Sequence, residues 1–405
     1  MKKLLFAGTF LALTAMLFWV SATAGTPGNP AISDSKLVSD LKLLEPITHG
    51  DLTIYPVVTS KGRDTSDFIT LDEGIRSGDV VVTETGNLHP RMIRHPNAQN
   101  PSRGAEVNRL VLVNNSKRPL ILLAGEIVTG GKQDRVVGKD RIVPAESDPV
   151  DLAVFCVEPH RWTETSSKFA TQGFLMAQPS VRAKAMADKD QGKVWAEVNS
   201  ARTRISAKLA PMPASPPASA PRAGGGGGDT SGSGISGTRA NTATSTIEVQ
   251  AAQAEIAGTS SYAVTRENKV VQKQLADITE PMQKSYESVI KQLRNQNAVG
   301  VVVAVRGRIV WADIFASHAL LNKYWPKLLQ SYAAESMTAS GQHGDASMKD
   351  AQHFLEDWAA RHETVDSEPG LYRQRELVGD HFRAFELTSL LTKDIFDLHL
   401  SKMAD

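Results

Sequence analysis

Two glutamates follow apolar runs of the chain, at positions that suit acid–base chemistry. Glu126 comes just after the apolar residues 120–124, and Glu158 comes directly after the apolar residues 152–157. Rigid scaffolds commonly present binding groups at strand ends and in the loops beyond them. Hydrolysis needs one carboxylate that activates water and often a second that protonates the leaving group. We therefore predict Glu126 and Glu158 as catalytic residues, with salt bridges to nearby arginines as the alternative interpretation.

A polar segment with a glycine pair lies between the two glutamates. Gly130 and Gly131 can adopt positive φ and expose successive backbone N–H groups, an arrangement that accepts anions. Lys132 and Arg135 carry charges that suit phosphate or carboxylate, and Gln133 carries an amide. An ordinary turn with solvated charges is the alternative. The predicted ligand-binding residues are Gly130, Gly131, Lys132, Gln133, Arg135, Arg161 and Trp162.

These polar residues are expected to share one site, because all of them border predicted strands in one short stretch of the chain. The segment 130–135 is long enough to fold back over the preceding strand end. We expect a pocket with one wall that binds an anionic small molecule. Asp134 and Asp313 are two further carboxylates beside predicted strands. The residues expected to converge are Glu126, Lys132, Gln133, Arg135, Glu158 and Arg161.

The motifs of other catalytic sites do not occur in the sequence. The ten histidines show no HExxH motif and no regular ligand spacing, so we predict no metal site. There is no GxSxG nucleophile elbow, no phosphate-binding GxxxxGK[ST] motif and no pattern that identifies a cofactor. Cys156 is the only cysteine and lies within an apolar run, which indicates a small buried side chain. A reactive thiol near Arg161 is the alternative.

The first 24 residues have the features of a secretory signal peptide. Two lysines precede an apolar run, and Ala22-Thr23-Ala24 offers a small-x-small cleavage site. An uncleaved membrane anchor is the alternative; cleavage would leave no stable membrane anchor. Without residues 1–24 the chain has 43 basic and 44 acidic residues, a formal charge of −1. We therefore expect an exported protein, periplasmic or extracellular, that does not bind nucleic acid.

Composition divides the mature chain. Residues 25–36 are rich in Gly, Pro and Ser and are predicted to be flexible, and residues 37–395 have globular composition. The Pro/Gly/Ser-rich residues 210–245 are predicted to be a disordered insert, because they cannot bury enough apolar surface. We favour one domain interrupted by this insert over two domains. The reason is that the later part has only one clear strand pair, at 298–305 and 309–311, and an isolated hairpin is marginal in water.

The pattern of apolar residues predicts an α+β fold. Strands are expected at 52–58, 80–83, 107–114, 120–124, 135–137, 142–143 and 152–157, and helices at 181–206, 269–295, 319–335 and 348–361. A turn signal at 114–117 suggests that 107–124 is a hairpin. Because strands precede helices, we predict a β-rich N-terminal part, joined by the later hairpin and flanked by helices.

Four motifs together resemble one bacterial family. They are Gly125-Glu126, residues 130–135, Ile142-Val143-Pro144 and residues 156–162. The sequence resembles the largely uncharacterised ADP-ribosylglycohydrolase and rhodanese-phosphatase-superfamily-associated protein domain family. The family pattern has glycine more often than histidine at the position of His160. The resemblance implies a ligand related to ADP-ribose or NAD, and it supplies no catalytic residues.

Two classes of function follow from these patterns. The first is an exported protein that binds, and hydrolyses, a phosphorylated small molecule such as a nucleotide or an ADP-ribose-related metabolite. The second is a non-catalytic structural or protein-interaction module of the bacterial cell envelope. A pocket that gathers the predicted residues favours the first class, whereas buried salt bridges among them favour the second.

Overall fold

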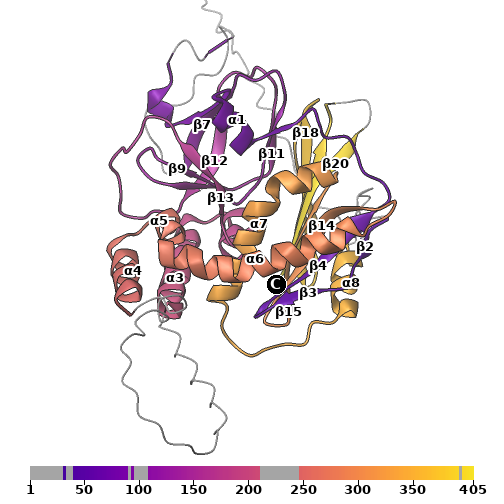
Figure 1. Ribbon diagram of the computed structural model, residues 1–405. Helices are drawn as coiled ribbons and strands as arrows, with labels where there is room; N and C mark the ends of the chain where they lie inside the picture. Colours follow the sequence, from indigo (N-terminus) through magenta and orange to yellow (C-terminus); the bar gives the residue numbers. More distant parts are fainter. Residues whose placement is uncertain (1–30, 33–39, 90–92, 95–107, 210–245, 392–394) are drawn as a thin grey trace, which may run out of the picture.

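Figure 1 shows a computed structural model of the chain. The structure describes residues 31–32, 40–89, 93–94, 108–209, 246–391 and 395–405. The predicted signal peptide and the predicted insert at 210–245 lie outside the described residues, as does the predicted flexible segment 25–36 apart from Ala31–Ile32. The described elements are strands grouped largely ahead of the long helices, with more strands after them, and the α+β prediction is confirmed.

The larger sheet has strands from both sides of the insert. The order is β17-β18-β19-β20-β15-β14-β4-β2, with β3 also paired to β4, and all neighbours are antiparallel. The predicted hairpin is β14–β15, and it joins the N-terminal strand β4 as expected. The bounds are β2 Lys42–Leu43, β3 Ile47–His49, β4 Leu52–Thr59, β14 Asn297–Val305, β15 Arg308–Phe315, β17 His362–Glu368, β18 Tyr372–Val378, β19 Phe382–Ser389 and β20 Phe396–Ala404.

The expectation of a single strand pair in the later part is wrong, because β17 to β20 complete this sheet. Strand β20 ends at Ala404, beyond the predicted domain boundary at residue 395. Most side chains of β17 are exposed, and all but Val365 are polar. Strand β20 buries polar side chains, among them Asp397, His399 and Lys402. Strand β17 therefore lacks the apolar alternation by which strands are recognised, whereas β20 has it, because Phe396, Leu398 and Leu400 alternate with polar residues.

Two smaller sheets form the N-terminal β-rich part. One has the order β13-β9-β10-β12-β7-β6 and the other the order β11-β8-β5, while β1 and β16 form a separate pair. The bounds are β1 Ala31–Ile32, β5 Ile69–Thr70, β6 Val80–Thr83, β7 Arg109–Asn114, β8 Leu120–Leu122, β9 Glu126–Thr129, β10 Arg135–Val137, β11 Arg141–Val143, β12 Val150–Cys156, β13 Ala170–Met176 and β16 Ala359–Ala360.

The expected hairpin at 107–124 is also wrong. Strand β7 pairs with β6 and β12, whereas β8 pairs with β11 and β5. The side chain of Asn114 explains the separation, because its Nδ2 donates to the carbonyl oxygens of Arg118 and Pro144, each at 2.9 Å. These bonds shape the turn after β7 so that the chain passes into the other sheet rather than back along β7.

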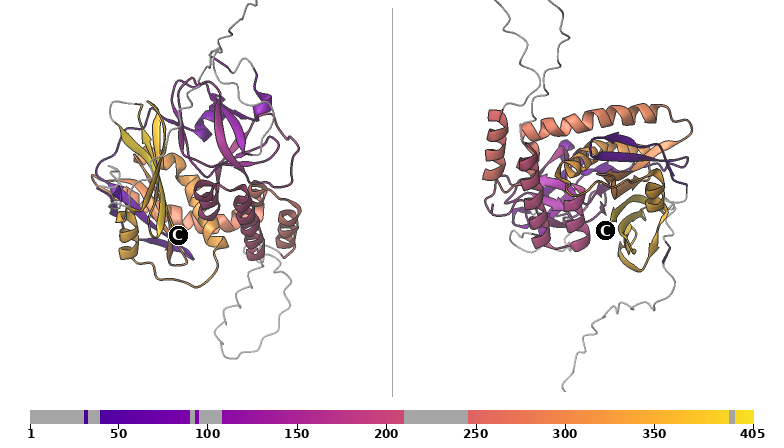
Figure 2. Two further views of the ribbon diagram at one scale, coloured as in Figure 1. Left: turned by 180° about the vertical axis from the view of Figure 1, so that it is seen from behind. Right: turned by 90° about the horizontal axis from the view of Figure 1, so that it is seen from below.

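Helices fill the space between the strand groups and cover the outside. In Figures 1 and 2 the two smaller sheets and the larger sheet form two groups side by side, and α7 runs between them. Helix α7 packs on β13 of one group and on β14 of the other. The bounds are α1 Leu71–Ser77, α2 Pro179–Ala183, α3 Gln191–Lys208, α4 Thr246–Gly258, α5 Tyr262–Glu267, α6 Lys269–Lys291, α7 His318–Thr338 and α8 Met348–Glu356.

The helices differ from the prediction mainly in where the helical backbone is interrupted. The predicted helix 181–206 is divided into α2 and α3, because a π-helical turn at Lys184–Asp188 leads into Lys189 with φ +52°. Pro281 lies inside α6 and does not end it. Within the ranges that the structure describes, no helix combines the length and the apolar character needed to cross a bilayer.

Candidate functional site

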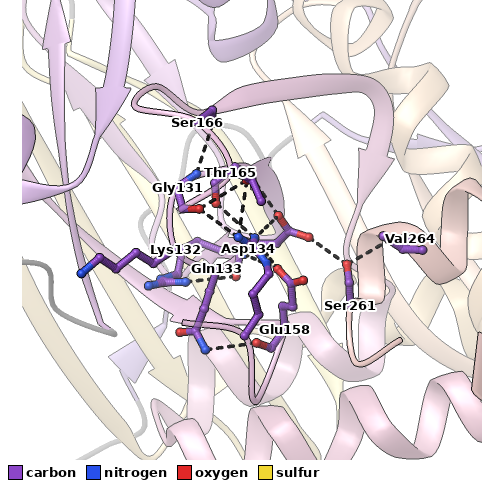
Figure 3. A network of polar contacts seen from close by, with 12 residues as sticks. Gly131, Lys132, Gln133, Asp134, Glu158, Thr165, Ser166, Ser261 and Val264 are labelled. Carbon is purple, nitrogen blue, oxygen red and sulfur yellow. Dashed lines mark hydrogen bonds and ion pairs between the residues drawn. The ribbon is translucent and has the colours of Figure 1, made fainter. Parts of the chain in front are cut away.

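Glu158, Asp134 and Arg161 form a charged cluster where β12 ends and β10 begins (Figure 3). Glu158 Oε2 accepts hydrogen bonds from the backbone N–H of Asp134 at 3.0 Å and from the Arg161 guanidinium at 2.5 Å. The same guanidinium nitrogen lies 3.4 Å from Asp134 Oδ1. One cation therefore holds two carboxylates that adjacent strand ends bring together.

This cluster lines an open hollow of about 420 Å³. Gly130, Glu158 and Arg161 are the predicted site residues in its wall, and Asp134 joins them. The rest of the wall, which includes Gln172 of β13, was not predicted from the sequence. The hollow also borders α5, whose N-cap residue Ser261 donates from its hydroxyl to Asp134 Oδ2 at 2.8 Å. A serine ahead of a short helix is common, so it carried no signal that it would meet Asp134.

The two carboxyl groups differ in environment. Burial, followed by the nearby charge of Glu158, raises the pKa of Asp134 to about 6, against the opposing bonds from Ser261 and Gly130. Glu158 keeps one oxygen for its bonds to Asp134 and Arg161, and its carboxylate faces the hollow. Asp134 therefore exchanges its proton near pH 6 beside the carboxylate of Glu158. Two such carboxyl groups can act together as a general acid and a general base.

The glycine pair has the predicted backbone conformation, with φ +124° at Gly130 and φ +50° at Gly131. A Cβ atom at Gly131 would lie 2.3 Å from the ring of Phe169, so glycine is required there. The amide groups, however, already have acceptors within the chain. Gly130 N–H donates to Asp134 Oδ1 at 3.1 Å and Gly131 N–H to Ser166 Oγ at 3.3 Å. The predicted anion nest therefore holds the protein's own polar groups.

Lys132 and Trp162 lie beside each other away from the acidic cluster. Lys132 Nζ is 5.2 Å from the centre of the Trp162 ring, and 45% of Trp162 is exposed. The Lys132 backbone N–H donates to Glu84 Oε1 at 3.0 Å. Figure 3 shows the Lys132 side chain extending away from Asp134 and Glu158. These two predicted ligand-binding residues are therefore not part of the hollow's wall.

Gln133 and Arg135 are buried beneath the cluster rather than presented to a ligand. Gln133 Nε2 donates to the backbone oxygen of Glu158 at 3.1 Å, which fixes the chain at this carboxylate. The guanidinium of Arg135 is fully buried, lies 4.0 Å from Glu84 Oε1, and has its pKa lowered by burial. Both residues therefore help to hold the backbone beneath the cluster and are not available to a ligand.

Cys156 is buried, which agrees with the first interpretation of this residue. It pairs with Arg135 across β12 and β10. Burial raises the pKa of its thiol, and its sulfur accepts the backbone N–H of Glu158 at 3.3 Å. A thiol with a raised pKa and no exposure is unreactive. The role of Cys156 is to fill the core and to hold the backbone of Glu158.

His160 has φ +75°, the left-handed conformation that favours glycine. This is the position at which the family pattern more often has glycine. The tight turn that a glycine would permit is therefore formed with histidine, at a cost of about 1 kcal/mol or more in backbone strain. The turn carries the chain from Glu158 to Arg161, so that the two side chains meet.

Glu126 does not join the hollow, and the prediction that it shares one site with Glu158 is wrong. Its buried carboxylate accepts from Lys327 Nζ of α7 at 2.8 Å and from the backbone N–H of Leu123 at 2.8 Å. Lys327 also pairs with Asp72 of α1. Although burial disfavours the ammonium, the two carboxylates raise the pKa of Lys327. Glu126 thus forms the salt bridge of the alternative interpretation, with a lysine in place of an arginine.

Asp313 belongs to a second buried network that joins the two strand groups. Arg182 of α2 donates from two nitrogens to its carboxylate, at 2.8 and 3.0 Å, and Tyr332 of α7 donates at 2.5 Å. His399 Nε2 lies 3.2 Å from Asp313 Oδ1, and His399 Nδ1 lies 2.6 Å from Asp140 Oδ2. All five side chains are fully buried, so the network is a structural connection rather than a binding surface.

Opposite charges on both sides of the imidazole fix its protonation state. Although burial disfavours the charged ring, Asp140 and then Asp313 raise the pKa of His399 to about 9. Although burial also opposes it, Arg182 holds the pKa of Asp313 well below its usual range. At neutral pH the ring therefore donates from both nitrogens to two carboxylates.

The fold and this geometry define an α+β protein whose candidate site is a carboxylate pair in an open hollow at strand ends. Across the described part of the chain, no three His, Cys, Asp or Glu side chains are grouped in a way that would hold a metal ion. The model of the ARG and Rhodanese-Phosphatase-superfamily-associated Protein domain family matches residues 40–402, and the chain belongs to this family. No curated protein and no solved structure matches the chain.

Proposed function

We propose that the protein is exported and that it binds and hydrolyses a ribose-containing phosphorylated molecule, such as a nucleotide or an ADP-ribose-related metabolite. The observation that carries the proposal is the pair of Asp134 and Glu158, two carboxyl groups of different environment in the wall of one hollow. The family is named for its association with ARG proteins. If ARG denotes ADP-ribosylglycohydrolase, as the resemblance implies, the name supports a ligand related to ADP-ribose.

The polar groups of the hollow fit hydroxyl groups better than phosphates. Glu158 accepts hydrogen bonds, and Gln172, Thr165 and Ser166 supply further polar atoms along the wall. Glu267, whose pKa burial raises, adds a third carboxyl group. The ribose of the ligand therefore faces the hollow, and its phosphates stay toward solvent, where the negative wall does not repel them.

The chemistry assigned to the pair is cleavage of a glycosidic bond. Glu158 takes a proton from a water molecule, whose oxygen forms a bond to the ribosyl carbon. Asp134 gives its proton to the leaving group as the glycosidic bond breaks. Arg161 holds both carboxyl groups in place, because one of its nitrogens contacts each of them. Hydrolysis should therefore fall as the pH rises through about 6, because Asp134 loses the proton it must donate.

The test is a screen of the chain without residues 1–24 against nucleotides, ADP-ribose, sugar phosphates and divalent metals, read as melting temperature and as product formed. Glu158→Gln should abolish turnover while fold and ligand binding survive, because the amide oxygen can still accept the Asp134 N–H. Glu280→Gln, on the exposed face of α6, is the matched control and should change nothing. Export is tested by mass spectrometry of the secreted protein. The measured mass should be that of a chain that begins at Gly25.

A second candidate, the non-catalytic envelope module, is favoured by the way the chain satisfies its own polar groups. The guanidinium of Arg161 donates to the backbone oxygens of Gly131 and Thr163 at 2.9 and 2.8 Å, besides its carboxylate partners. The hydrolase proposal fails if no ligand raises the melting temperature of the parent and if Glu158→Gln lowers the melting temperature in the absence of ligand. The cluster is then structural.

A further inference from the structure

A second cavity, which shares no lining residue with the hollow, lies in the larger sheet where β4 and β15 end and β20 begins. It has a volume of about 450 Å³, within the range of small-molecule sites. The loop after β4 forms one wall and the start of β20 forms another, while Phe315 and Ala316 at the end of β15 lie between them. None of its residues belongs to the predicted site at 126–162.

Arg63 supplies an accessible cation in the loop wall. Its backbone N–H donates to the oxygen of Ala316 at 2.9 Å, which attaches the loop to the end of β15. Its exposed guanidinium lies 5.9 Å from the centre of the Phe396 ring, a cation–π distance. Within the described residues Arg63 forms no ion pair, whereas its neighbour Lys61 pairs with Asp40. The fork of donors on Arg63 therefore remains available at the cavity.

One carboxyl group, Asp397, lies in the opposite wall, and a second is buried behind it. Asp397 lines the cavity and accepts from Thr388 Oγ1 at 2.9 Å. Glu386 lies behind it on β19, almost fully buried, and its Oε2 is 3.4 Å from a guanidinium nitrogen of Arg375. Burial, followed by Asp397, raises the pKa of Glu386 to about 8, against Arg375 and Arg373 of β18. Above that pH, ionisation of Glu386 adds a negative charge behind the wall.

We propose that this cavity binds a small organic anion, whose carboxylate or phosphate group binds Arg63 and whose apolar body packs on Phe396. A guanidinium that is held over a ring and has no ion-pair partner matches a planar oxyanion. Phe396, with the buried Phe315 and Ala316 beneath the cavity, gives the apolar surface that such a ligand needs. Ionisation of Glu386 adds a negative charge behind Asp397, so the affinity for an anion falls as the pH rises through about 8.

The experiment uses the full mature chain and three probes of similar shape: benzoate, phenyl phosphate and the neutral benzamide. Calorimetric titration at pH 7 should show binding of an anionic probe and none of benzamide, and the two anions tell a carboxylate site from a phosphate site. Arg63→Gln should weaken binding about ten- to a hundredfold, because it removes a charge-assisted hydrogen bond. Arg294→Gln, an exposed arginine after α6, is the matched control and should bind as the parent does.

The pH dependence separates this proposal from weak surface binding. The parent should lose affinity between pH 7 and 9, whereas Glu386→Gln, which resembles the protonated carboxyl, should bind equally at both values. Equal binding of benzamide, unchanged binding by Arg63→Gln, or no binding of either anion would overturn the proposal. The result is independent of the hydrolase proposal, because Glu158 and the hollow take no part in it.

Discussion

Replacement of His399 by glutamine should remove a pH-dependent contribution to stability. The pKa of His399 is raised to about 9 in the folded chain, against about 6.5 for an ordinary histidine. A difference of about 2.5 pKa units corresponds to about 3 kcal/mol. Because the folded pKa is the higher one, this stability is fully present below pH 6.5 and is lost as the pH rises through about 9.

Urea unfolding followed by tryptophan fluorescence at pH 6, 8 and 10 measures the effect. At pH 6 the variant should be about 3–5 kcal/mol less stable than the parent, because Asp140 and Asp313 lose a buried cationic partner. At pH 10 this difference should shrink by about 3 kcal/mol. His318→Gln, at a half-buried position, is the control and should leave the pH dependence intact. A difference between parent and His399→Gln that is the same at all three pH values would refute the reasoning.

Two further substitutions test the buried contacts around α7 and α2. Gly125→Ala should cost about 3 kcal/mol, because Gly125 has φ +97° and a Cβ there would lie 2.6 Å from Arg182 Cγ; guanidinium unfolding measures the loss. Lys327→Met should cost about 3–5 kcal/mol, because it leaves the buried carboxylates of Glu126 and Asp72 without their shared cation; the melting temperature and the denaturation midpoint both report it.

Each of these substitutions has a matched control in the chain. Gly258→Ala, where a Cβ would meet nothing within 4 Å, should change stability by no more than about 1 kcal/mol. Lys323→Met removes a partly exposed pair with Glu73 and should cost about 1 kcal/mol or less. Controls as harmful as Gly125→Ala and Lys327→Met would mean that burial and clash are not the causes.

The fold was predictable where apolar residues form the strand. Strands β4, β6 and β10 are short apolar runs with buried side chains, and their positions in the sequence were recognised. Strand β17 gave no such signal, because it is mostly exposed and polar, and β20 was missed although Phe396, Leu398 and Leu400 alternate with polar residues that are also buried. The buried polar groups of β20 are acceptable only because partners such as Asp313 and Asp140 meet them, and no local pattern reports such partners.

The site was predictable only where its residues lie close in the sequence. Glu158 and Arg161 are three residues apart, and the return of Gly130 toward them follows from the pairing of β10 with β12. Glu126 was misassigned because its partner Lys327 lies 201 residues further along the chain. Arg63 and the cavity beside it gave no signal, because the loop after β4 and the strand β20 meet only in the folded sheet.

The pairing of β14 with β4 has a kinetic consequence. Val302 pairs with Tyr55, 247 residues earlier, so this edge of β14 stays open until a very long loop has closed. Folding that depends on such distant partners is slow. In the meantime β14 exposes the uncharged run Val299-Gly300-Val301-Val302-Val303-Ala304-Val305, which has the composition of an aggregation-prone segment. The yield of refolding is therefore governed by how quickly β4 and β15 cover the two edges of this one strand.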